Sequence, residues 1–444
     1  MRVVVTYPGN FMHAQQAGRA FYERDALAAF VTGINFSESN FLRKLCAHLP
    51  SAVGEHVAKQ LRRRAITEVP PCKIVSYPWL EMLRATLSRN AKNPIYADMA
   101  WNALSHRFDK RVARGHLDGI DAVCAFEYTA RYTFEEAARR GIARILAMPS
   151  IDSKEFEEIK NREEARFPEL RAQHHRYFAE RFKRRYEHRR TEIALADLIV
   201  ANSEATRRSH VRAGTDPEKI VAVPLAAPPA ISAIDKPEED INRPLLVVWA
   251  GNFVIGKGAH YFIDAWRALA PGKFARAKAY GAIGLPERVL RPLPPGLELM
   301  GPVPQANLLA AFDHADVLVF PTLADGFGMV VTEAFSRGLP VITTTSAGAS
   351  ELVRHGWNGL VIPVADSAAI ASAVRWCLDN RKELYEMRFR ALETARHWQW
   401  PDHRRQLIAK VMQGLRSAGY TADFGPEIEK SGVGACLDGF VSAS

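Results

Sequence analysis

Short apolar runs alternate with stretches of helical spacing throughout the C-terminal half of the chain. The apolar runs are mostly continuous, which is typical of strands buried on both faces of a parallel sheet. They occupy residues 245–251, 275–282, 297–301, 316–321, 340–344 and 359–363, and the helical stretches occupy 259–270, 307–315, 329–338, 349–356 and 367–380. This order of strands and helices predicts a doubly wound α/β domain.

The N-terminal half shows a looser version of the same pattern. Residues 3–7 predict a strand, followed by a loop at 8–10 and then a helix. Later strands are predicted at 119–127, 143–149 and 197–202, and the charged stretch 153–195 is predicted to be helical. The segments 194–203 and 313–322 share an Ala-Asp pair, an apolar strand and a final Ser or Thr. That internal similarity favours two related, Rossmann-like domains.

The boundaries of the two domains follow from the same patterns. A first Rossmann-like domain is expected at 1–232 and a second at 245–394, joined by a polar linker at 233–244. The last helices, at 395–420, are long enough to cross back onto the first domain. The tail 421–444 is rich in Gly, Ser and Ala, and we expect it to be poorly ordered. Doubly wound sheets bind ligands beyond the carboxyl ends of their strands, so the functional site is expected in the cleft between the domains.

The composition is that of a globular protein, with 48% hydrophobic and 24% charged residues among 444. No run of eighteen apolar residues predicts a transmembrane helix, and the N-terminus lacks the apolar core of a signal peptide. The five cysteines are scattered without CxxC spacing, which argues against a disulfide framework or a structural zinc site. We therefore expect a cytoplasmic protein.

The chain is basic, with a formal net charge of +10 and clusters of arginine and lysine at 60–64 and 181–190. One interpretation is a solvated helix face. A second is peripheral contact with anionic lipid head groups on the inner face of a membrane. The third, nucleic-acid binding, is the least favoured because no RNA- or DNA-binding signature accompanies the charge.

The stretch ADGFGMVVTE, which begins at residue 324, combines two glycines with an acid on each side. It follows a predicted strand, and a helix is predicted to begin after the second glycine. The amides and partial positive charge of a helix N-terminus attract phosphate, and Gly326 and Gly328 let a ligand approach the backbone. Asp325 and Glu333 would then flank a bound diphosphate and accept hydrogen bonds from sugar and ribose hydroxyls. The alternative for Asp325 is a loop acid favoured by the helix dipole.

Motif residues continue from this stretch to residue 359. They comprise an acid before Gly-Phe-Gly, a second Glu, a Gly-x-Pro turn, a third Glu and an Asn-Gly pair: Asp325, Gly326, Phe327, Gly328, Glu333, Ala334, Gly338, Pro340, Gly348, Glu351, Asn358 and Gly359. This series resembles the donor-binding core of retaining glycosyltransferases of the GT-B fold, family 4 (glycosyl transferases group 1). The segment VVWAGNFVIGKG, with Lys257 near its end, is similar to the same family's phosphate-binding loop.

The resemblance implies a role for each matching position in the second domain. Asp325 would orient the transferred sugar, although the family usually has Glu there, and Glu333 would hold the ribose. Lys257 would act on the phosphates. Asn252 stands where the family has an Arg. The remaining donor-binding positions would be Gly251, Gly301, Gly326, Phe327, Gly328, Met329 and Val330.

In the first domain the resemblance is thinner. Gly9 and Asn10 would correspond to a loop that touches the donor phosphates, and the alternative is an ordinary turn between a strand and a helix. Many family members carry a His after a middle strand, which is absent here. Ser150 and Asp152 are candidate substitutes, and Glu127 is another candidate for the cleft.

The implied activity is that of a retaining hexosyltransferase of polysaccharide biosynthesis. It would move a sugar from a UDP- or GDP-sugar to a hydroxyl of a glycan, a lipid-linked glycan or a small molecule. No DxD motif lies beside the site, so neither a metal nor another cofactor is expected. The alternatives are a different GT-B enzyme, such as a hydrolase or phosphorylase, and a non-catalytic protein that binds nucleotide sugars.

Overall fold

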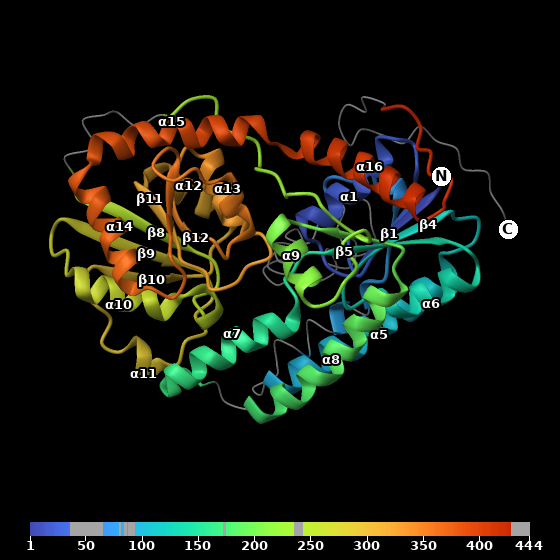
Figure 1. Cartoon of the computed structure of the whole chain (residues 1–444), viewed down its shortest axis with the longest axis horizontal. Coiled ribbons are helices and arrows are strands. Elements are labelled where there is room, and N and C mark those ends of the chain that lie inside the picture. The colour runs from blue at the N-terminus through green and yellow to red at the C-terminus, as the bar shows by residue number, and fades with distance from the viewer. Residues whose placement is uncertain are drawn as a thin grey trace, which may run out of the picture.

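The computed structural model describes residues 1–35, 65–79, 81–83, 87, 94–171, 175–234 and 243–427. Two sheets organise them (Figure 1): a seven-stranded sheet in the order β3-β2-β1-β4-β5-β6-β7 and a six-stranded sheet in the order β10-β9-β8-β11-β12-β13. All pairings between these strands are parallel. Each sheet grows outward in both directions from its first strand, β1 or β8, which is the doubly wound topology. The predicted fold class is therefore confirmed.

The first domain carries the seven-stranded sheet between helices. Its strands are β1 (Val3–Tyr7), β2 (Leu27–Thr32), β3 (Ile74–Ser76), β4 (Ala122–Phe126), β5 (Ala143–Met148), β6 (Leu198–Ala201) and β7 (Ile220–Ala222). Its helices are α1 (Met12–Tyr22), α5 (Pro94–Gly115), α6 (Arg131–Arg139), α7 (Ser153–Arg166), α8 (His175–Leu195) and α9 (Glu204–Arg212), with short 3-10 turns η1 (Pro71–Lys73) and η2 (Pro168–Leu170).

The second domain repeats the arrangement with six strands. They are β8 (Leu245–Ala250), β9 (Ala275–Tyr280), β10 (Leu297–Gly301), β11 (Val317–Phe320), β12 (Val341–Thr344) and β13 (Gly359–Ile362). The helices in this half of the chain are α10 (Ala259–Leu269), α11 (Glu287–Leu290), α12 (Gln305–His314), α13 (Met329–Ser336), α14 (Ser367–Asp379), α15 (Arg381–His397) and α16 (Trp400–Ser417), with 3-10 turns η4 (Ile255–Lys257) and η5 (Gly348–Leu352).

The last two helices tie the domains together. In Figure 1, α15 runs along the second domain and α16 continues over the first. The apolar side of α16, including Leu407 and Val411, is buried in the core of the first domain. Arg404 donates hydrogen bonds to Glu23 and Gln16, both at 2.7 Å, which fixes α16 to α1 and the turn after it. The predicted crossover to the first domain is confirmed.

The internal similarity noted in the sequence has a structural counterpart. Asp197, just before β6, accepts a hydrogen bond from the backbone N–H of Arg144 at 2.8 Å. Asp316, just before β11, accepts one from the backbone N–H of Leu246, also at 2.8 Å. In both domains the Asp thus joins the start of one strand to the start of its neighbour, and both Asp side chains also pair with an arginine. The shared motif marks equivalent places in two similar sheets.

Helix α7 belongs to the first half of the chain but packs against the second domain (Figure 1). The buried carboxylate of Glu163 lies 2.7 Å from the hydroxyl of Tyr261 and 3.1 Å from Nε2 of His260. Leu170, in the turn that follows, is buried in the hydrophobic core of the second domain. The α7 segment is therefore a second bridge between the two sheets, on the side opposite α15.

Some expectations about secondary structure need correction. Residues 349–356 form only the short 3-10 turn η5, because Asn358 accepts the N–H of Arg354 and donates to the carbonyl of Leu352, which ends the turn. The predicted tail is not wholly loose either. Ala422 and Phe424 are buried against the first domain, and Phe424 contacts Phe21 edge to face at 5.5 Å. Residues 428–444 lie outside the described part, as does the basic cluster at 60–64 and most of the predicted linker.

The cysteines also depart in part from expectation. Cys124 and Cys377 are buried, free thiols, as predicted. Cys72 is disulfide-bonded, so the expectation of unpaired cysteines is wrong at this position. Among the described residues, no helix combines the length and the hydropathy that a membrane-spanning segment requires.

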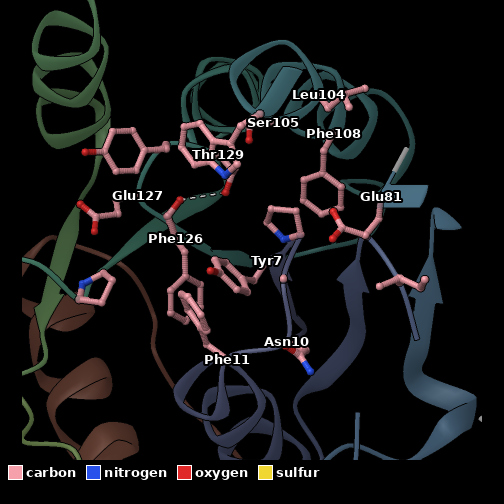
Figure 2. Close-up of a pocket in the computed structure, with 17 residues that line it drawn as sticks. Tyr7, Asn10, Phe11, Glu81, Leu104, Ser105, Phe108, Phe126, Glu127 and Thr129 are labelled. Atoms are coloured by element: carbon pink, nitrogen blue, oxygen red, sulfur yellow. Dashed lines mark hydrogen bonds between the residues drawn. The ribbon is translucent and has the colours of Figure 1, made fainter. Parts of the chain in front are cut away.

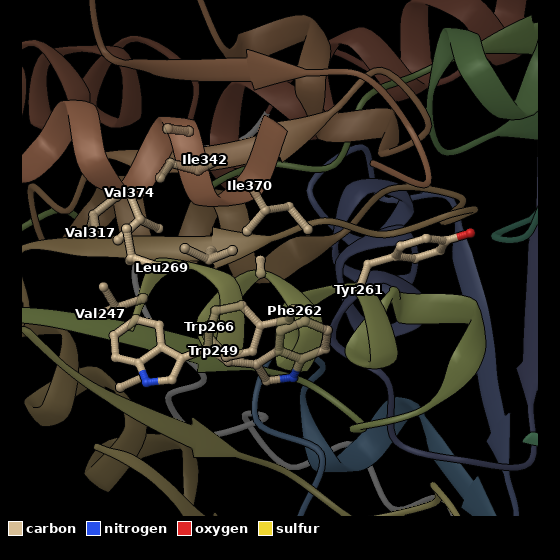
Figure 3. Packing of buried hydrophobic residues seen from close by; sticks show 14 of the residues in the cluster. Val247, Trp249, Tyr261, Phe262, Trp266, Leu269, Val317, Ile342, Ile370 and Val374 are labelled. Atoms are coloured by element: carbon tan, nitrogen blue, oxygen red, sulfur yellow. The ribbon is translucent and has the colours of Figure 1, made fainter. Parts of the chain in front are cut away.

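A group of aromatic side chains lies within the core of the second domain (Figure 3). Phe262 of α10 is completely buried and lies between the rings of Trp249 on β8 and Trp266, with ring centroids 5.5 and 6.0 Å away. This cluster holds α10 on the sheet and thereby fixes the loop between β8 and α10. Phe274, in the same domain, is 64% exposed and provides a natural comparison.

We expect Phe262→Ala to lower the free energy of unfolding by about 3–5 kcal/mol, because it leaves a cavity in a close-packed core. Phe274→Ala removes the same side chain from the surface and should change it by no more than about 0.5 kcal/mol. Urea unfolding followed by tryptophan fluorescence measures both. Equal effects of the two substitutions would contradict the packing described here.

Candidate functional site

The acid and glycine loop of residues 325–328 lies between β11 and α13. Gly328 immediately precedes α13 and has φ +87°, in the left-handed region that favours glycine. A Cβ at this position would lie 2.8 Å from the ring of Phe320, so the packing also requires glycine. The side chains of Phe327 and Val330 are buried in the hydrophobic core and only their backbone can meet a ligand. The sequence therefore fixes a turn that starts a helix at the carboxyl end of the sheet.

Backbone N–H groups at the start of α13 are available. The N–H of Phe327 donates to the carboxylate of Asp325 at 3.2 Å. Within the described part of the chain, the N–H groups of Gly328, Met329 and Val330 donate no hydrogen bond. The first N–H groups of a helix have no partner inside the helix, and together with the helix dipole they favour an anion. Gly328 and Val330 are nevertheless buried, and Met329 is partly exposed. A ligand would therefore approach these N–H groups from the side of Met329.

Lys257 and Asp325, which are 68 positions apart in sequence, form an ion pair. Lys257 ends the 3-10 turn η4 after β8, and the carbonyl of Gly256 in that turn accepts hydrogen bonds from the N–H of Leu323 at 3.0 Å and the hydroxyl of Thr322 at 3.1 Å. The turn is thus attached to the chain that leads from β11 into the acid and glycine loop. Both charged side chains remain partly exposed, so they can reach a ligand.

Glu333 lies on α13, one turn beyond the glycines, and is half-buried. Its carboxylate accepts a hydrogen bond from Nε2 of Gln305 at 2.7 Å. Gln305 is the first residue of α12 and follows β10 by a short loop. Burial raises the pKa of the Glu333 carboxyl above its ordinary value, and the hydrogen bond from Gln305 opposes that shift. Sequence reasoning did not single out Gln305, whose only signal is its position at a helix start.

The remaining predicted donor residues lie at the carboxyl ends of neighbouring strands. Gly251 and Asn252 follow β8, and both are exposed. Gly301 ends β10, and its carbonyl accepts the N–H of Gly281 at 2.9 Å. The side chain of Asn252 makes no hydrogen bond with the described residues. The structure thus brings together the candidates that follow β8, β10 and β11, all at the carboxyl ends of these parallel strands. Among them, Lys257 and Asp325 are in contact.

The same loop touches the first domain. The carbonyl oxygen of Gly326 accepts hydrogen bonds from Ser203 Oγ at 2.5 Å and Thr206 Oγ1 at 3.0 Å, both at the start of α9. A Cβ on Gly326 would lie 2.2 Å from the carbonyl oxygen of Pro149. Position 326 therefore requires glycine, because the backbones of the two domains approach each other closely there. This approach places the two domains in contact at the candidate site. Sequence reasoning missed this contact of Ser203 and Thr206 with the second domain.

A cavity of about 460 Å³ opens on the first-domain side of this contact (Figure 2). It lies at the carboxyl ends of β1 and β4, against α5, and Pro149 forms part of its wall. The predicted residues Gly9, Asn10 and Glu127 line it. Aromatic rings supply much of the rest: Tyr7, Phe11, Trp101, Phe108, Phe126 and Tyr128. Aromatic faces of this kind suit the apolar faces of sugar rings or hydrocarbon.

Glu127 sits in the wall of this cavity and forms a buried ion pair with Arg189 of α8. Ser150 donates to the Glu127 carboxylate at 2.5 Å, and Arg189 donates to Ser150 at 3.1 Å. Burial raises the pKa of the Glu127 carboxyl, and the positive charge of Arg189 opposes that effect. The basic stretch 181–190 is therefore not simply a solvated helix face, because Arg189 points into the domain.

Neither candidate substitute for the missing His reaches the cleft as a free group. Asp152 is buried and caps α7, accepting the N–H of Lys154 at 2.9 Å. The Ser150 hydroxyl is engaged by Glu127 and Arg189. His210 of α9 lies behind the same loop, 3.0 Å from the carbonyl of Ser150, and burial lowers its pKa to about 4. Its burial makes it a structural imidazole rather than a group that meets a ligand.

Within the described ranges, no group of three or more His, Cys, Asp or Glu side chains is arranged to hold a metal ion. What the site offers is a set of backbone amides, one lysine and two separated acids on the second domain, and an aromatic cavity with a buried acid on the first. Such a set suits a phosphorylated ligand that carries hydroxyl groups.

Comparison with known proteins identifies the second domain. The family model described as "Glycosyl transferases group 1" matches residues 244–380. These residues are a glycosyl transferases group 1 domain. The match contains Lys257, Asp325 and Glu333, so the sequence resemblance is confirmed for the part of the chain that carries the donor-site candidates.

Curated relatives of this group 1 domain match less than the whole chain. The D-inositol 3-phosphate glycosyltransferase of Nocardia farcinica is 26% identical over 55% of this chain and 56% of its own length. Sucrose-phosphate synthase 4 of Arabidopsis thaliana is 31% identical over 24% of this chain and 10% of its own length. The chain therefore spans about half of the first protein and a tenth of the second.

The similarity in structure extends further than the group 1 domain. Anabaena HepE, solved in complex with UDP and glucose, superposes with a TM-score of 0.59 at 15% identity. The match covers 93% of this chain and 100% of HepE. At this level of identity the likeness concerns the fold, and it confirms the GT-B arrangement of two Rossmann-like domains.

The contact of Gly326 with the first domain yields a prediction. We expect Gly326→Ala to disfavour this closed arrangement, because the added methyl group would overlap the Pro149 carbonyl and overpacking costs typically about 1–3 kcal/mol. Small-angle X-ray scattering should show a larger radius of gyration. Gly115→Ala is the control, since a Cβ there meets no atom of the described residues within 4 Å. An unchanged radius for Gly326→Ala would show that the contact does not hold the domains.

The environment of Glu333 predicts a pH-dependent stability. A carboxyl whose pKa is raised in the folded state binds its proton more tightly there, so stability falls as the pH rises from the ordinary pKa through the raised one. Glu333→Gln removes the half-buried charge and can still accept a hydrogen bond from Gln305. We expect a higher Tm than wild type at pH 7.5 and a difference that shrinks towards pH 4. A lower Tm for Glu333→Gln at pH 7.5 would contradict this account.

Proposed function

We propose that the chain is a glycosyltransferase that moves a sugar from a nucleotide-diphosphate donor to an acceptor hydroxyl, with retention at the anomeric carbon. The observation that carries this proposal is the contact of Lys257 with Asp325 beside the free amides of α13, inside a glycosyl transferases group 1 domain. The relatives named as glycosyltransferase and synthase, and the HepE complex with UDP and glucose, support it.

The donor is proposed to lie along the carboxyl edge of the second sheet. Its diphosphate would meet the N–H groups before and within the first turn of α13, together with Lys257. Phosphate oxygens would then share Lys257 with Asp325, which frees carboxylate lone pairs for hydroxyls of the transferred sugar. Glu333 and Gln305 would face the ribose, where a carboxylate can accept from two adjacent hydroxyls. Gly251 and Gly301 would flank the nucleotide at the ends of β8 and β10.

The acceptor is proposed to occupy the aromatic cavity of the first domain. Pro149 belongs to the wall of that cavity and also touches Gly326, so an acceptor there would lie next to the loop that carries Asp325. The two domains we assign to donor and acceptor are 245–394 and 1–232, the latter with the crossover at 395–420. Gly9 and Asn10 border the same cavity and would close over the donor phosphates.

The chemistry we propose is electrostatic. As the bond between the sugar and the diphosphate breaks, negative charge builds up on the leaving phosphate, and Lys257 and the α13 amides would stabilise it. The acceptor oxygen would form the new bond on the same face of the sugar, and its proton would pass to the leaving phosphate. The contact of Gly326 with Ser203 and Thr206 would exclude water from one side of this reaction.

The test is isothermal titration calorimetry with UDP, GDP, and UDP-, GDP- and ADP-sugars. We expect at least one nucleotide to bind the wild type. Lys257→Met should lower the affinity for that nucleotide roughly 10- to 100-fold, because a hydrogen bond to a charged group contributes about 1.5–3 kcal/mol. Lys273→Met, at an exposed position of the same domain, is the matched control and should bind as the wild type does.

Glu333→Gln should lower the affinity for the intact nucleotide but leave the affinity for inorganic pyrophosphate unchanged, because Glu333 is assigned only to the ribose. Retention is checked by ¹H NMR of the anomeric signal in the product. Absence of binding by every nucleotide and nucleotide sugar would refute the proposed donor site, and equal binding by Lys257→Met would refute the role of that residue.

A further inference from the structure

A second cavity, of about 430 Å³, adjoins the aromatic one on the first domain. It lies between α5, α6 and α8, and it shares Trp101, Ser105 and Tyr128 with the aromatic cavity. Figure 2 shows Ser105 on the α5 wall of the aromatic cavity. The two cavities are therefore adjacent. The aromatic cavity extends to Pro149, which lies beside the Gly326 loop.

The lining of the second cavity is strongly basic. Four arginines contribute to it, Arg131 from α6 and Arg181, Arg184 and Arg185 from α8, whereas Glu187 is the one acid among the described lining residues. His106 and His188 also line it, with rings stacked at 4.8 Å. Burial lowers the pKa of His106 to about 4, so arginine supplies the positive charge there at neutral pH.

Ion pairs neutralise only part of this charge. Arg181 and Arg185 share the single carboxylate of Asp98, and Arg131 pairs with Glu135 on its own helix. Arg184 is exposed and forms no ion pair with the described residues. Nε of Arg185 is buried and has no hydrogen-bond partner among the described residues, so this nitrogen is not open to a ligand. The guanidinium groups that a ligand can reach belong to the exposed Arg184 and to the partly exposed arginines of the same lining, Arg131, Arg181 and Arg185.

Guanidinium groups bind phosphate through two parallel hydrogen bonds, and Arg is the preferred residue where that geometry matters. We propose that the second cavity binds a phosphate group of the acceptor, while the part of the acceptor that carries the reacting hydroxyl lies in the aromatic cavity. This inference rests on the proposed function. It assigns the acceptor to the phosphorylated class and gives the arginines of α8 a role in selecting it.

The donor phosphates have a separate place. Lys257 and the start of α13 are on the second domain, beyond the contact of Gly326 with Pro149. A phosphate in the arginine cavity therefore does not compete with the donor diphosphate, and it can be measured when the donor site is filled. Two sources of the phosphate share this chemistry, a soluble sugar phosphate and a phosphorylated isoprenoid lipid.

The experiment is a calorimetric titration of the full chain with glucose 6-phosphate and with geranyl phosphate, each in the absence and presence of saturating UDP. Glucose and geraniol are the uncharged counterparts. We expect one phosphorylated probe to bind with and without UDP and its uncharged counterpart to bind at least tenfold more weakly. Binding of glucose 6-phosphate alone assigns a sugar phosphate, and binding of geranyl phosphate alone assigns a lipid phosphate.

Variants of α8 test the position of the site. Arg184→Ala should lower the affinity for the phosphorylated probe about tenfold. The double variant, which combines Arg131→Ala with Arg184→Ala, should lower that affinity further. Lys183→Ala is the matched control, because Lys183 is the exposed neighbour on the same helix, carries the same charge and does not line the cavity. Circular dichroism and the affinity for UDP should remain as in the wild type in all three variants.

Three results would overturn the inference. One is unchanged probe affinity in the double variant, and another is displacement of the probe by UDP, which would place it at the donor site. Failure of both probes to bind while UDP binds also overturns it, but leaves the proposed function standing. Failure of every nucleotide and nucleotide sugar to bind, while a probe binds in an Arg184-dependent manner, would overturn the proposed function alone.

Discussion

The carbonyl oxygen of Gly326 joins the two domains at the place where the candidate groups meet. It accepts from Ser203 and Thr206 of the first domain, while the residue before it carries the carboxylate that pairs with Lys257. A backbone oxygen can be shared in this way only where no side chain separates the chains, which is why glycine is needed. The position of the acid therefore depends on the second sheet, on η4 and on the closure of the domains together.

Charge in and around the site is arranged in pairs that a ligand can rearrange. Lys257 is paired with Asp325, and Arg189 is paired with Glu127 at the wall of the aromatic cavity. The two pairs differ in burial. The Arg189 pair is almost inaccessible, and losing one partner would leave a buried, uncompensated charge. The Lys257 pair is partly exposed, so a phosphate can approach the lysine beside the carboxylate. The first pair thus suits a structural role and the second a ligand-binding role.

Much of the second domain was predictable because its pattern is local. Strands buried on both faces of a parallel sheet must be continuously apolar, and β8, β11, β12 and β13 all begin and end within a residue or so of the predicted runs. The acid and glycine motif also has a local cause, a left-handed residue before a helix. In the first domain, β2, β3 and β7 were not predicted. β3 and β7 have only three residues each, and all three strands take their register from neighbouring strands rather than from a pattern of their own.

The sequence alone determined the doubly wound class, the group 1 motif and the candidates Lys257, Asp325 and Glu333, because periodicity and motif spacing are properties of the chain. Only the tertiary structure decided which candidates touch. It brought Lys257 to Asp325 across 68 positions, paired Glu333 with Gln305, and turned Arg189 inward while Arg184 stayed exposed on the same helix. Contacts between distant segments depend on how strands stack and helices pack, and no local pattern encodes them.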